Sequence, residues 1–497
     1  MTVVAGASHP RTGGEILALQ LLAAIFLAMR IWYQFAGGVL SDEAYYWMWG
    51  QHPAWSYFDH PPLHAWLLGL ISFIGWHPFS VRLLTWASLA LVLAIFWHWS
   101  ARLAPANPRL WFWRATALYL ASPLFFVLTS AAYNDHLLVA LCLAATHCFG
   151  IFVERAEAGQ DRAKRWLYTA ALVLGLAALT KYNAVFLGLG FALTFLIRPK
   201  LRPLLLTPAP WLAALLALAT QLPVLWWNLS EAGASFRYHF DDRWAGDRGG
   251  LDWSGALVFL ITSLLFWSPF LLWPLIRLVR TPAGTPFESV LRTPALATFV
   301  VSTLILTATS LVLGAYSYWN IVALTALTPL LVAVSSSWLR IVHYVYGLLI
   351  ALLMMVNFSI MPVATILNAR DFGTAINYDW HILAERIEAA QAQHPDALLA
   401  ATRYSTTSQL GFALGTTEVV KLSPEHSQWD FWQESRDFSG QSALILADES
   451  DRSGVVKFLR ARFETLEAID SITIERFGKP IYRWRILLGT NWRPPTD

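Results

Sequence analysis

The sequence predicts a polytopic α-helical membrane protein that carries a small C-terminal α/β domain. Of the 497 residues, 56% are hydrophobic and only 13% are charged, which is about half the charged share of a soluble globular protein. The 26 Trp and 16 Tyr residues fit the aromatic belts found at both membrane interfaces. From Asn368 onward, charges become frequent and apolar runs become short, so the chain changes character there.

Apolar stretches long enough to cross a membrane, roughly 20 residues each, predict about eleven transmembrane helices. The N-terminus has no compact signal-peptide pattern, so we expect the first stretch to stay as an anchor. Cys142 and Cys148 fall inside one predicted helix on poorly matched faces, and we expect no disulfide. The predicted spans lie near residues 15–36, 80–101, 111–131, 137–153, 166–180, 183–198, 206–228, 254–276, 295–315, 318–336 and 341–362.

Residues 61–77 form one more apolar stretch, which the charge pattern assigns to a helix lying along the membrane interface. If this stretch does not cross and the N-terminus is cytoplasmic, most Lys and Arg residues before residue 341 fall in cytoplasmic loops. The opposite side then has no Lys or Arg at 41–81 or 115–154, as the positive-inside rule requires. Eleven crossings place the C-terminus outside the cytoplasm. In a bacterium this is the periplasm, and the protein spans the inner (plasma) membrane.

The tail alternates strand and helix patterns, which predicts a small α/β domain. We therefore expect a transmembrane domain at 1–366 and a periplasmic α/β domain at 367–497. The strand candidates are 397–401, 418–422, 442–447 and 480–488, and the helix candidates are 378–393, 404–414 and 453–462.

Two adjacent carboxylates, Asp42 and Glu43, follow the first predicted span. The stretch 41–64 around them is rich in aromatic residues and contains no Lys or Arg. Ser41 can cap a helix whose first turn holds both carboxylates, and one interpretation is that they only stabilise this turn. Because carboxylates near a membrane are costly without a local cation, we also interpret them as a general base, or an orienting carboxylate, for a hydroxyl or amine nucleophile.

Other candidate residues lie on the same side of the membrane in this topology. Asn134 and Asp135 open the helix at 137–153, where Asn134 acts as a cap or Asp135 supplies a second carboxylate. Lys181 either extends to the interface or meets an anion. Arg237 and Arg243 lie in an aromatic loop suited to a phosphate head group, or they pair with the loop's own Asp residues.

A metal site is a further interpretation of the early loop, because His60 and His64 have i, i+4 spacing and His52, Asp42, Glu43 and Asp59 lie near them. The two prolines after His60 interrupt this spacing, and the loop has no full ligand motif. We expect no required cofactor. The sequence has no phosphate-binding Gly-rich motif and no GxSxG, and its basic clusters do not argue for nucleic acid.

Two segments of the early loop, Asp42-Glu43-Ala44-Tyr45-Tyr46-Trp47 and Tyr57-Phe58-Asp59-His60-Pro61-Pro62-Leu63, resemble the first external loop of bacterial glycosyltransferase family 39. The similarity continues at Asn134-Asp135-His136-Leu137, at Leu179-Thr180-Lys181-Tyr182 and in tail segments around Ser408-Gln409-Leu410 and Ser427-Gln428-Trp429-Asp430. This family has the GT-C fold, uses polyprenyl-phosphate sugars, and is related to protein O-mannosyltransferases and the lipid A aminoarabinose transferase.

The resemblance implies a membrane glycosyltransferase that moves a sugar from a donor such as undecaprenyl-phosphate sugar to lipid A or its core, another glycan or a protein. It implies a catalytic carboxylate at Asp42, supported by Glu43, and a phosphate-binding cation at Lys181. By extrapolation beyond the family motif, we expect Arg237 and Arg243 to extend that phosphate site. Tyr45, Tyr57, Asp59 and His60 are expected to line the substrate pocket. A lipid-linked sugar flippase or transporter is the alternative, although the internal repeats typical of transporters are not evident. A lipid-linked oligosaccharide polymerase or ligase is a second competitor.

Overall fold

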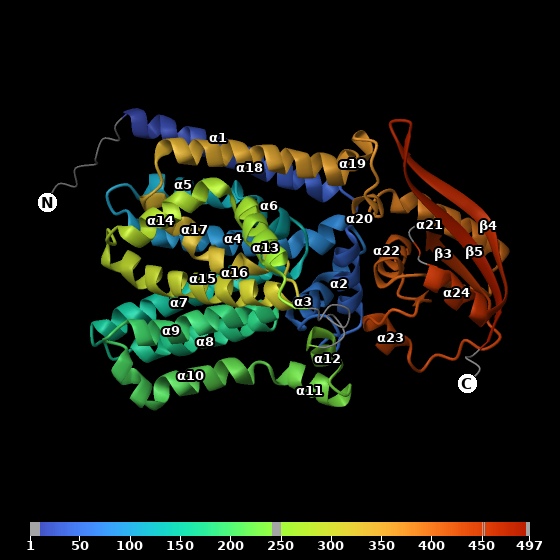
Figure 1. Cartoon of the computed structure of the whole chain (residues 1–497), viewed down its shortest axis with the longest axis horizontal. Coiled ribbons are helices and arrows are strands. Elements are labelled where there is room, and N and C mark those ends of the chain that lie inside the picture. The colour runs from blue at the N-terminus through green and yellow to red at the C-terminus, as the bar shows by residue number, and fades with distance from the viewer. Residues whose placement is uncertain (1–9, 241–249, 450, 452, 494–497) are drawn as a thin grey trace. The chain divides into compact units, whose positions relative to one another are not determined.

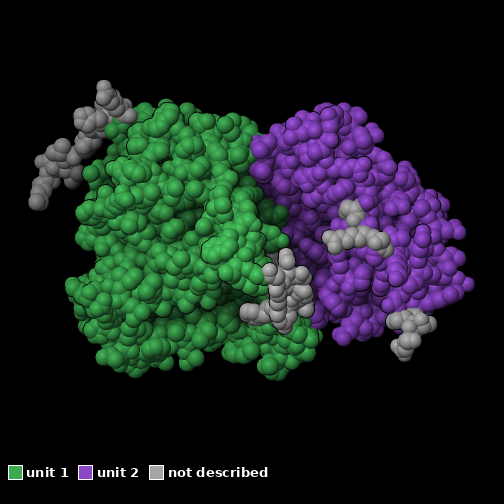
Figure 2. All heavy atoms as spheres, viewed as in Figure 1, with its two compact units in different colours: residues 1–31, 60–63, 84–352 green, residues 32–59, 64–83, 353–497 purple. Residues whose placement is uncertain are grey.

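The computed structural model describes residues 10–240, 250–449, 451 and 453–493. The chain forms two compact units, which Figure 2 colours separately. Unit 1 consists of residues 1–31, 60–63 and 84–352, and unit 2 consists of residues 32–59, 64–83 and 353–497. The bounds of these two units do not test the predicted domain boundary at residue 366, which stays a prediction.

Unit 1 is helical. Helices α1 (Pro10–Ala36), α4 (Pro78–Leu103) and α18 (Ser337–Met355) each have residues in both units. The other helices of unit 1 are α5 (Pro108–Leu120), α6 (Pro123–Ser130), α7 (Asn134–Glu157), α8 (Ala163–Ala178), α9 (Val185–Ile197), α10 (Pro208–Ala219), α11 (Leu222–Ser230), α12 (Ala234–Phe240), α13 (Trp253–Trp267), α14 (Leu272–Arg280), α15 (Pro286–Val312), α16 (Ile321–Thr325) and α17 (Leu327–Leu330).

The apolar helices make this a multi-pass membrane protein. Among the described residues, five helices are long and apolar enough to cross a membrane, and the number rises to eight if each of three bent helix pairs is one span. These eight correspond to eight of the predicted spans, whereas α8 and α9 are shorter than a full span. The total of eleven therefore stays a prediction. The stretch assigned to the interface forms α3 (Leu63–Ile71) and a short 3₁₀ turn, and a helix of this length, at 1.5 Å per residue, is too short to cross.

Residues 318–336 differ from the single predicted span. They fold as α16, α17 and flanking 3₁₀ turns at Ser317–Asn320 and Leu331–Ala333. Residues 321–332 are buried throughout. Irregular backbone is tolerated at membrane depth where protein rather than lipid surrounds it, which accounts for the broken helix. Elsewhere the predicted absence of a disulfide is confirmed, because Cys142 and Cys148 are both buried and free in α7.

Close helix packing in unit 1 relies on small residues. Gly190 on α9 faces Thr298 on α15, and a Cβ at position 190 would lie 2.0 Å from Thr298 Oγ1 and 2.8 Å from the Thr298 backbone nitrogen. Only glycine allows this approach, as is common between helices in membranes.

Unit 2 combines the segment after α1 with the tail. Its early part holds α2 (Ser41–Gln51) and most of α3. The tail contributes α19 (Val363–Ile366), α20 (Phe372–Ala375), α21 (Trp380–Gln393), α22 (Tyr404–Leu414), α23 (Gln428–Gln433), α24 (Ser453–Arg462) and strands β1 (Leu398–Ala401), β2 (Val419–Lys421), β3 (Ala443–Asp448), β4 (Phe463–Arg476) and β5 (Lys479–Trp492).

The five strands form one sheet in the order β2-β1-β3-β5-β4, in the orange and red part of the chain in Figure 1. Strands β1, β2 and β3 are parallel, as the predicted β-α-β pattern requires, and β5 runs antiparallel to both β3 and β4. Every residue of the central strand β3 is buried, which explains its unbroken apolar run. Phe477 and Gly478, both at positive φ, turn β4 directly into β5, as in two-residue hairpin loops.

The tail elements follow the prediction closely except at one strand and at the short helices α20 and α23, which were not predicted. Strands β1, β2 and β3 and helices α22 and α24 match their predicted ranges within a residue. The predicted strand at 480–488 covers most of the longer β5 (Lys479–Trp492), whereas β4 was not predicted. This edge strand is mostly exposed and carries Glu464, Glu467, Asp470 and Glu475, so it has no apolar run to reveal it.

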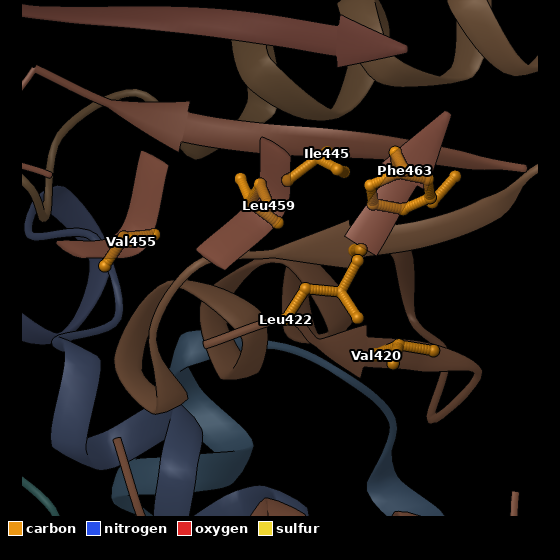
Figure 3. Close-up of a cluster of buried hydrophobic side chains, with 8 residues drawn as sticks. Val420, Leu422, Ile445, Val455, Leu459 and Phe463 are labelled. Atoms are coloured by element: carbon orange, nitrogen blue, oxygen red, sulfur yellow. The ribbon is translucent and has the colours of Figure 1, made fainter. Parts of the chain in front are cut away.

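The sheet core lies between the strands and α24. Val455 and Leu459 on α24 pack against Ile445 on β3 and Phe463 on β4, with Val420 and Leu422 beside them (Figure 3). These side chains are all at most 7% exposed. Burying a side chain of this size contributes about 1.5–3 kcal/mol, so the tail has its own hydrophobic core.

Candidate functional site

Helix α2 carries the acidic pair in unit 2. Its N-cap is Leu40, with extended backbone angles of φ −72° and ψ 156°, so Ser41 is the first helical residue rather than the predicted cap. The Glu43 side chain accepts a hydrogen bond from the Leu40 backbone N–H at 2.9 Å. Two carboxylates in the first turn also suit the positive end of the helix dipole.

Glu43 forms a fully buried ion pair with Arg82 on α4. Arg82 Nε donates to Glu43 Oε1 at 2.8 Å and Nη2 donates to Oε2 at 2.6 Å, and both side chains are 0% exposed. Arg82 also donates to the carbonyl of Tyr33, near the end of α1, at 3.1 Å. It donates to the carbonyl of Gly38, just after α1, at 2.7 Å. Both Glu43 oxygens are therefore engaged, and the local setting without a cation does not persist in the fold.

Asp42 differs from its neighbour in burial. It is partly buried, whereas Glu43 is completely buried. A carboxylate held in two charge-assisted hydrogen bonds to Arg82 accepts a proton only at the cost of that pair. Glu43 is therefore poorly suited to act as a general base.

Two tyrosines of the expected pocket have buried hydroxyls. The Tyr45 hydroxyl accepts a hydrogen bond from the Gln428 backbone N–H at 2.8 Å and is hydrogen-bonded to the side chain of Asp59. Burial, reinforced by the Asp59 charge, raises the pKa of Tyr45 well above its ordinary value, so the phenol stays protonated and can donate to Asp59. Tyr57 stacks on Trp49 at 4.7 Å between ring centroids, and its hydroxyl donates to the Trp49 carbonyl at 2.9 Å. Tyr57 thus folds the loop back on α2.

Unit 1 brings Asp135 and Lys181 together. Asp135 lies in the first turn of α7, and Lys181 lies between the end of α8 and a 3₁₀ turn at Tyr182–Ala184. Lys181 Nζ lies 2.9 and 2.8 Å from the two Asp135 oxygens, and the residues are 7% and 3% exposed. Lys181 Nζ also lies 5.1 Å from the centre of the Tyr318 ring. Two predicted site residues, 46 positions apart in sequence, thus form one ion pair.

His136 and Tyr182, which follow Asp135 and Lys181 in sequence, contact polar and aromatic side chains of unit 1. His136 Nδ1 lies 2.8 Å from Ser88 Oγ, and the Tyr182 hydroxyl lies 3.3 Å from Ser235 Oγ. The Tyr182 ring meets His239 of α12 edge to face at 5.3 Å. Arg237 is exposed on α12. The ring centre of His60 lies 6.5 Å from that of His239. Arg243 lies outside the described residues.

The histidines of the early loop have other contacts. His52 Nδ1 lies 3.0 Å from the Met48 carbonyl, its ring stacks on Trp432 at 4.2 Å, and His64 meets Tyr46 at 5.6 Å. In the part of the chain that the structure describes, no group of three or more His, Cys, Asp or Glu side chains is arranged to hold a metal ion.

Sequence reasoning missed Arg82, the residue that neutralises Glu43. A signal for it was present, because Arg82 is the first basic residue after the acidic pair and lies inside the predicted span 80–101. An ionisable residue within a span needs a partner, and the preceding loop offered only carboxylates.

Comparisons with known proteins give a partial family match, one curated relative and a shared fold. Residues 59–227 match the family described as dolichyl-phosphate-mannose-protein mannosyltransferase. The chain is 27% identical over 340 residues to a lipid A galacturonosyltransferase, RgtD, of Rhizobium johnstonii; the match covers 65% of this chain and 66% of the relative. The chain thus spans slightly less than two thirds of that relative.

The crystal structure of ArnT from Cupriavidus metallidurans in the apo state is similar to this fold. The TM-score is 0.60 at 14% identity, over 94% of this chain and 97% of ArnT. ArnT bound to undecaprenyl phosphate gives a TM-score of 0.59 over the same shares. At this identity the likeness shows the fold, and it confirms the predicted GT-C architecture. The shared fold shows that the chain has the GT-C architecture, and the partial family match and the curated relative make it similar to glycosyltransferase family 39.

Proposed function

We propose that this protein is a membrane glycosyltransferase that moves a sugar from a polyprenyl-phosphate donor to an acceptor of the cell envelope. The observation that carries the proposal is the family match over residues 59–227, because this range contains both Asp135 and Lys181. The curated relative's description as a lipid A galacturonosyltransferase and the fold shared with an undecaprenyl-phosphate-bound structure support the same reaction class.

In this mechanism an acceptor hydroxyl attacks the anomeric carbon of the donor sugar. The new carbon–oxygen bond forms as the bond from the anomeric carbon to the phosphate oxygen breaks, and the hydroxyl proton passes to Asp42. The lipid phosphate leaves with its bonding electron pair. A single displacement of this kind inverts the anomeric centre. Asp42 is the proposed base because Glu43 is occupied by Arg82.

Cations stabilise the leaving phosphate in this proposal. Lys181 has three donor protons, and its contacts with the two Asp135 oxygens leave donor capacity for a phosphate oxygen. Asp135 then orients the ammonium group instead of acting as a second base. Arg237, exposed on α12, and Arg243 are proposed as further phosphate contacts. Preorganised charge of this kind is often the largest catalytic contribution.

The other proposed site residues act around the reacting groups. Glu43 fixes the first turn of α2 through Arg82, and Tyr45 orients Asp59 for contact with the sugar or the acceptor. Tyr57 supports the loop from behind, because its hydroxyl is committed to backbone carbonyls of Trp49 and His52. His60 is proposed to line the substrate pocket.

We further propose that the reaction takes place at the periplasmic face of a bacterial inner membrane, with a cytoplasmic N-terminus and a periplasmic tail. The distribution of Lys and Arg supports this orientation. Lipid A or its core, another envelope glycan and a protein are the proposed acceptor classes, and the donor sugar is a hexose, pentose or uronic acid.

Reconstitution in liposomes with a radiolabelled polyprenyl-phosphate sugar tests the proposal. The label is expected to move onto lipid A or another envelope acceptor, with release of the lipid phosphate. Movement of intact labelled lipid across the bilayer without any new glycosidic bond would instead identify a flippase and overturn the proposal.

A further inference from the structure

The first turn of α2 takes its cap from a residue more than three hundred positions away. The N-cap Leu40 has no side-chain oxygen, so it cannot accept a hydrogen bond from the first amides of the helix. Asn377, which follows α20, supplies that oxygen. Asn377 Oδ1 accepts from the Ser41 backbone N–H at 2.9 Å and from Ser41 Oγ at 3.2 Å. The residue next to Asp42 is thus held by the tail.

Asn377 is itself fixed in orientation. Its Nδ2 group donates to the carbonyls of Gly373 at 2.9 Å and Thr374 at 3.2 Å, so its oxygen must face α2. Gln409 on α22 donates through Nε2 to Asn377 Oδ1 at 3.1 Å and to the Val39 carbonyl at 3.0 Å. Asn377 and Gln409 are at most 7% exposed. The network therefore ties the chain before and after Leu40 to two tail elements.

A second tail residue holds the other side of this turn. Gln428 at the start of α23 donates its backbone N–H to the Tyr45 hydroxyl at 2.8 Å, and its Oε1 accepts from the Phe58 backbone N–H at 2.8 Å. Tyr45 lies one helical turn after Asp42, and Phe58 precedes Asp59. Gln428 is 2% exposed, so water does not compete for these contacts.

We propose that Asn377 and Gln428 are positioning residues for Asp42, and that the tail is therefore part of the catalytic apparatus. This inference rests on the proposed function, in which Asp42 takes the proton of the acceptor. A base must be held within a fraction of an ångström of its working position, because a displacement of about 1 Å costs on the order of a hundredfold in rate. Neither residue touches the reacting atoms. Both act through the backbone and side chains of α2 and its loop.

The chain offers a matched control within the same helix. Gln433, at the end of α23, donates to the Lys421 carbonyl at 2.9 Å and accepts from the Lys421 backbone N–H at 3.1 Å. These bonds join α23 to β2 and do not involve α2. The variants Gln428→Met and Gln433→Met therefore each remove side-chain hydrogen bonds from α23. Only the first releases Phe58 in the loop after α2, and the Gln428 backbone N–H still donates to Tyr45 on α2.

The test measures kcat, donor KM and the thermal midpoint of the purified full-length protein for Asn377→Leu, Gln428→Met, Gln433→Met and Asp42→Asn. We expect Asn377→Leu and Gln428→Met to lower kcat about ten- to a hundredfold with donor KM within about twofold. Gln433→Met should lower the thermal midpoint to a similar extent but keep kcat within about twofold of the wild type.

Two results would overturn the inference, and they differ from each other. If Asp42→Asn abolishes transfer while Asn377→Leu and Gln428→Met keep wild-type kcat, the tail has no positioning role and the proposed function stands. If Asp42→Asn keeps near-normal transfer, the proposed base is wrong and the inference falls with it.

Discussion

Arg82 binds both carboxylate oxygens of Glu43 at 2.8 and 2.6 Å, with neither side chain exposed to solvent. The pair joins the first turn of α2 to α4, and the remaining Arg82 donors reach carbonyls near the end of α1. Two adjacent acidic residues thus have different surroundings, and this separates a structural carboxylate from a candidate base.

The first prediction concerns this buried pair. Removing one partner, as in Glu43→Leu or Arg82→Met, leaves a buried group uncompensated and should lower the free energy of unfolding by about 3–5 kcal/mol. The double variant Glu43→Leu with Arg82→Met should recover part of that loss. Thermal unfolding in detergent measures all three. If the two single losses simply add in the double variant, the pair contributes no coupling.

Lys181 is predicted to bind the donor phosphate and stabilise its charge as it leaves. Lys181→Met removes the cation and should lower kcat/KM by about 10²–10³-fold, the range for losing one preorganised donor. The exposed Lys200 on the same unit provides a control, because Lys200→Met removes an equal charge and should leave transfer unchanged. A phosphate role for Lys181 would be contradicted by equal, small effects of the two variants.

Asp451 gives unit 2 a predictable pH dependence. Burial, reinforced by the charge of Asp448, raises the pKa of Asp451 to about 6. The folded state therefore binds this proton more tightly than the unfolded chain, whose Asp titrates near 3.9. The stability of unit 2 should fall as pH rises from about 4 to about 6, by an amount on the order of 2–3 kcal/mol from this group.

The variant Asp451→Asn should flatten that dependence in thermal unfolding measured between pH 4 and 7. Asp437→Asn serves as the control, because hydrogen bonds from the Ser439 hydroxyl and backbone lower the pKa of Asp437, in the direction opposite to the shift of Asp451. An unchanged slope in Asp451→Asn would show that other groups set the pH dependence.

Gly411 is predicted to set the distance between α22 and α2. A Cβ at this position would lie 2.2 Å from Met48 Cε and 2.8 Å from the Thr416 carbonyl oxygen. The Met48 side chain can move, but the carbonyl cannot do so without distorting the end of α22. Gly411→Val should therefore destabilise unit 2 by about 1–3 kcal/mol, the usual cost of overpacking, as measured by thermal unfolding. Wild-type stability in this variant would mean that the helices separate at no cost.

Much of the fold followed from sequence because its signals are local. Apolar length predicted the long helices, and the alternation of strands and helices predicted β1, α22 and β2. The edge strand β4 was missed because its exposed charged residues give it no apolar run. The broken stretch at 318–336 was missed because only surrounding protein makes irregular backbone tolerable there.

The site was harder to predict because it depends on contacts between distant residues. Asp135 and Lys181 were each recognised as candidates, but their sequence positions do not reveal that they pair. The partner of Glu43 is 39 residues away and the cap of α2 is 336 residues from Ser41. Such partners are determined by how distant helices and strands pack together, and no local sequence pattern reveals which residues that packing brings into contact.

The most direct test is sugar transfer by purified Asp42→Asn, reconstituted with a radiolabelled polyprenyl-phosphate sugar and an envelope acceptor. The amide keeps the size of the side chain but cannot take a proton, so we expect normal folding, a normal thermal midpoint and transfer reduced by about 10²–10⁴-fold. Near wild-type transfer by this variant would contradict the assignment of Asp42 as the base.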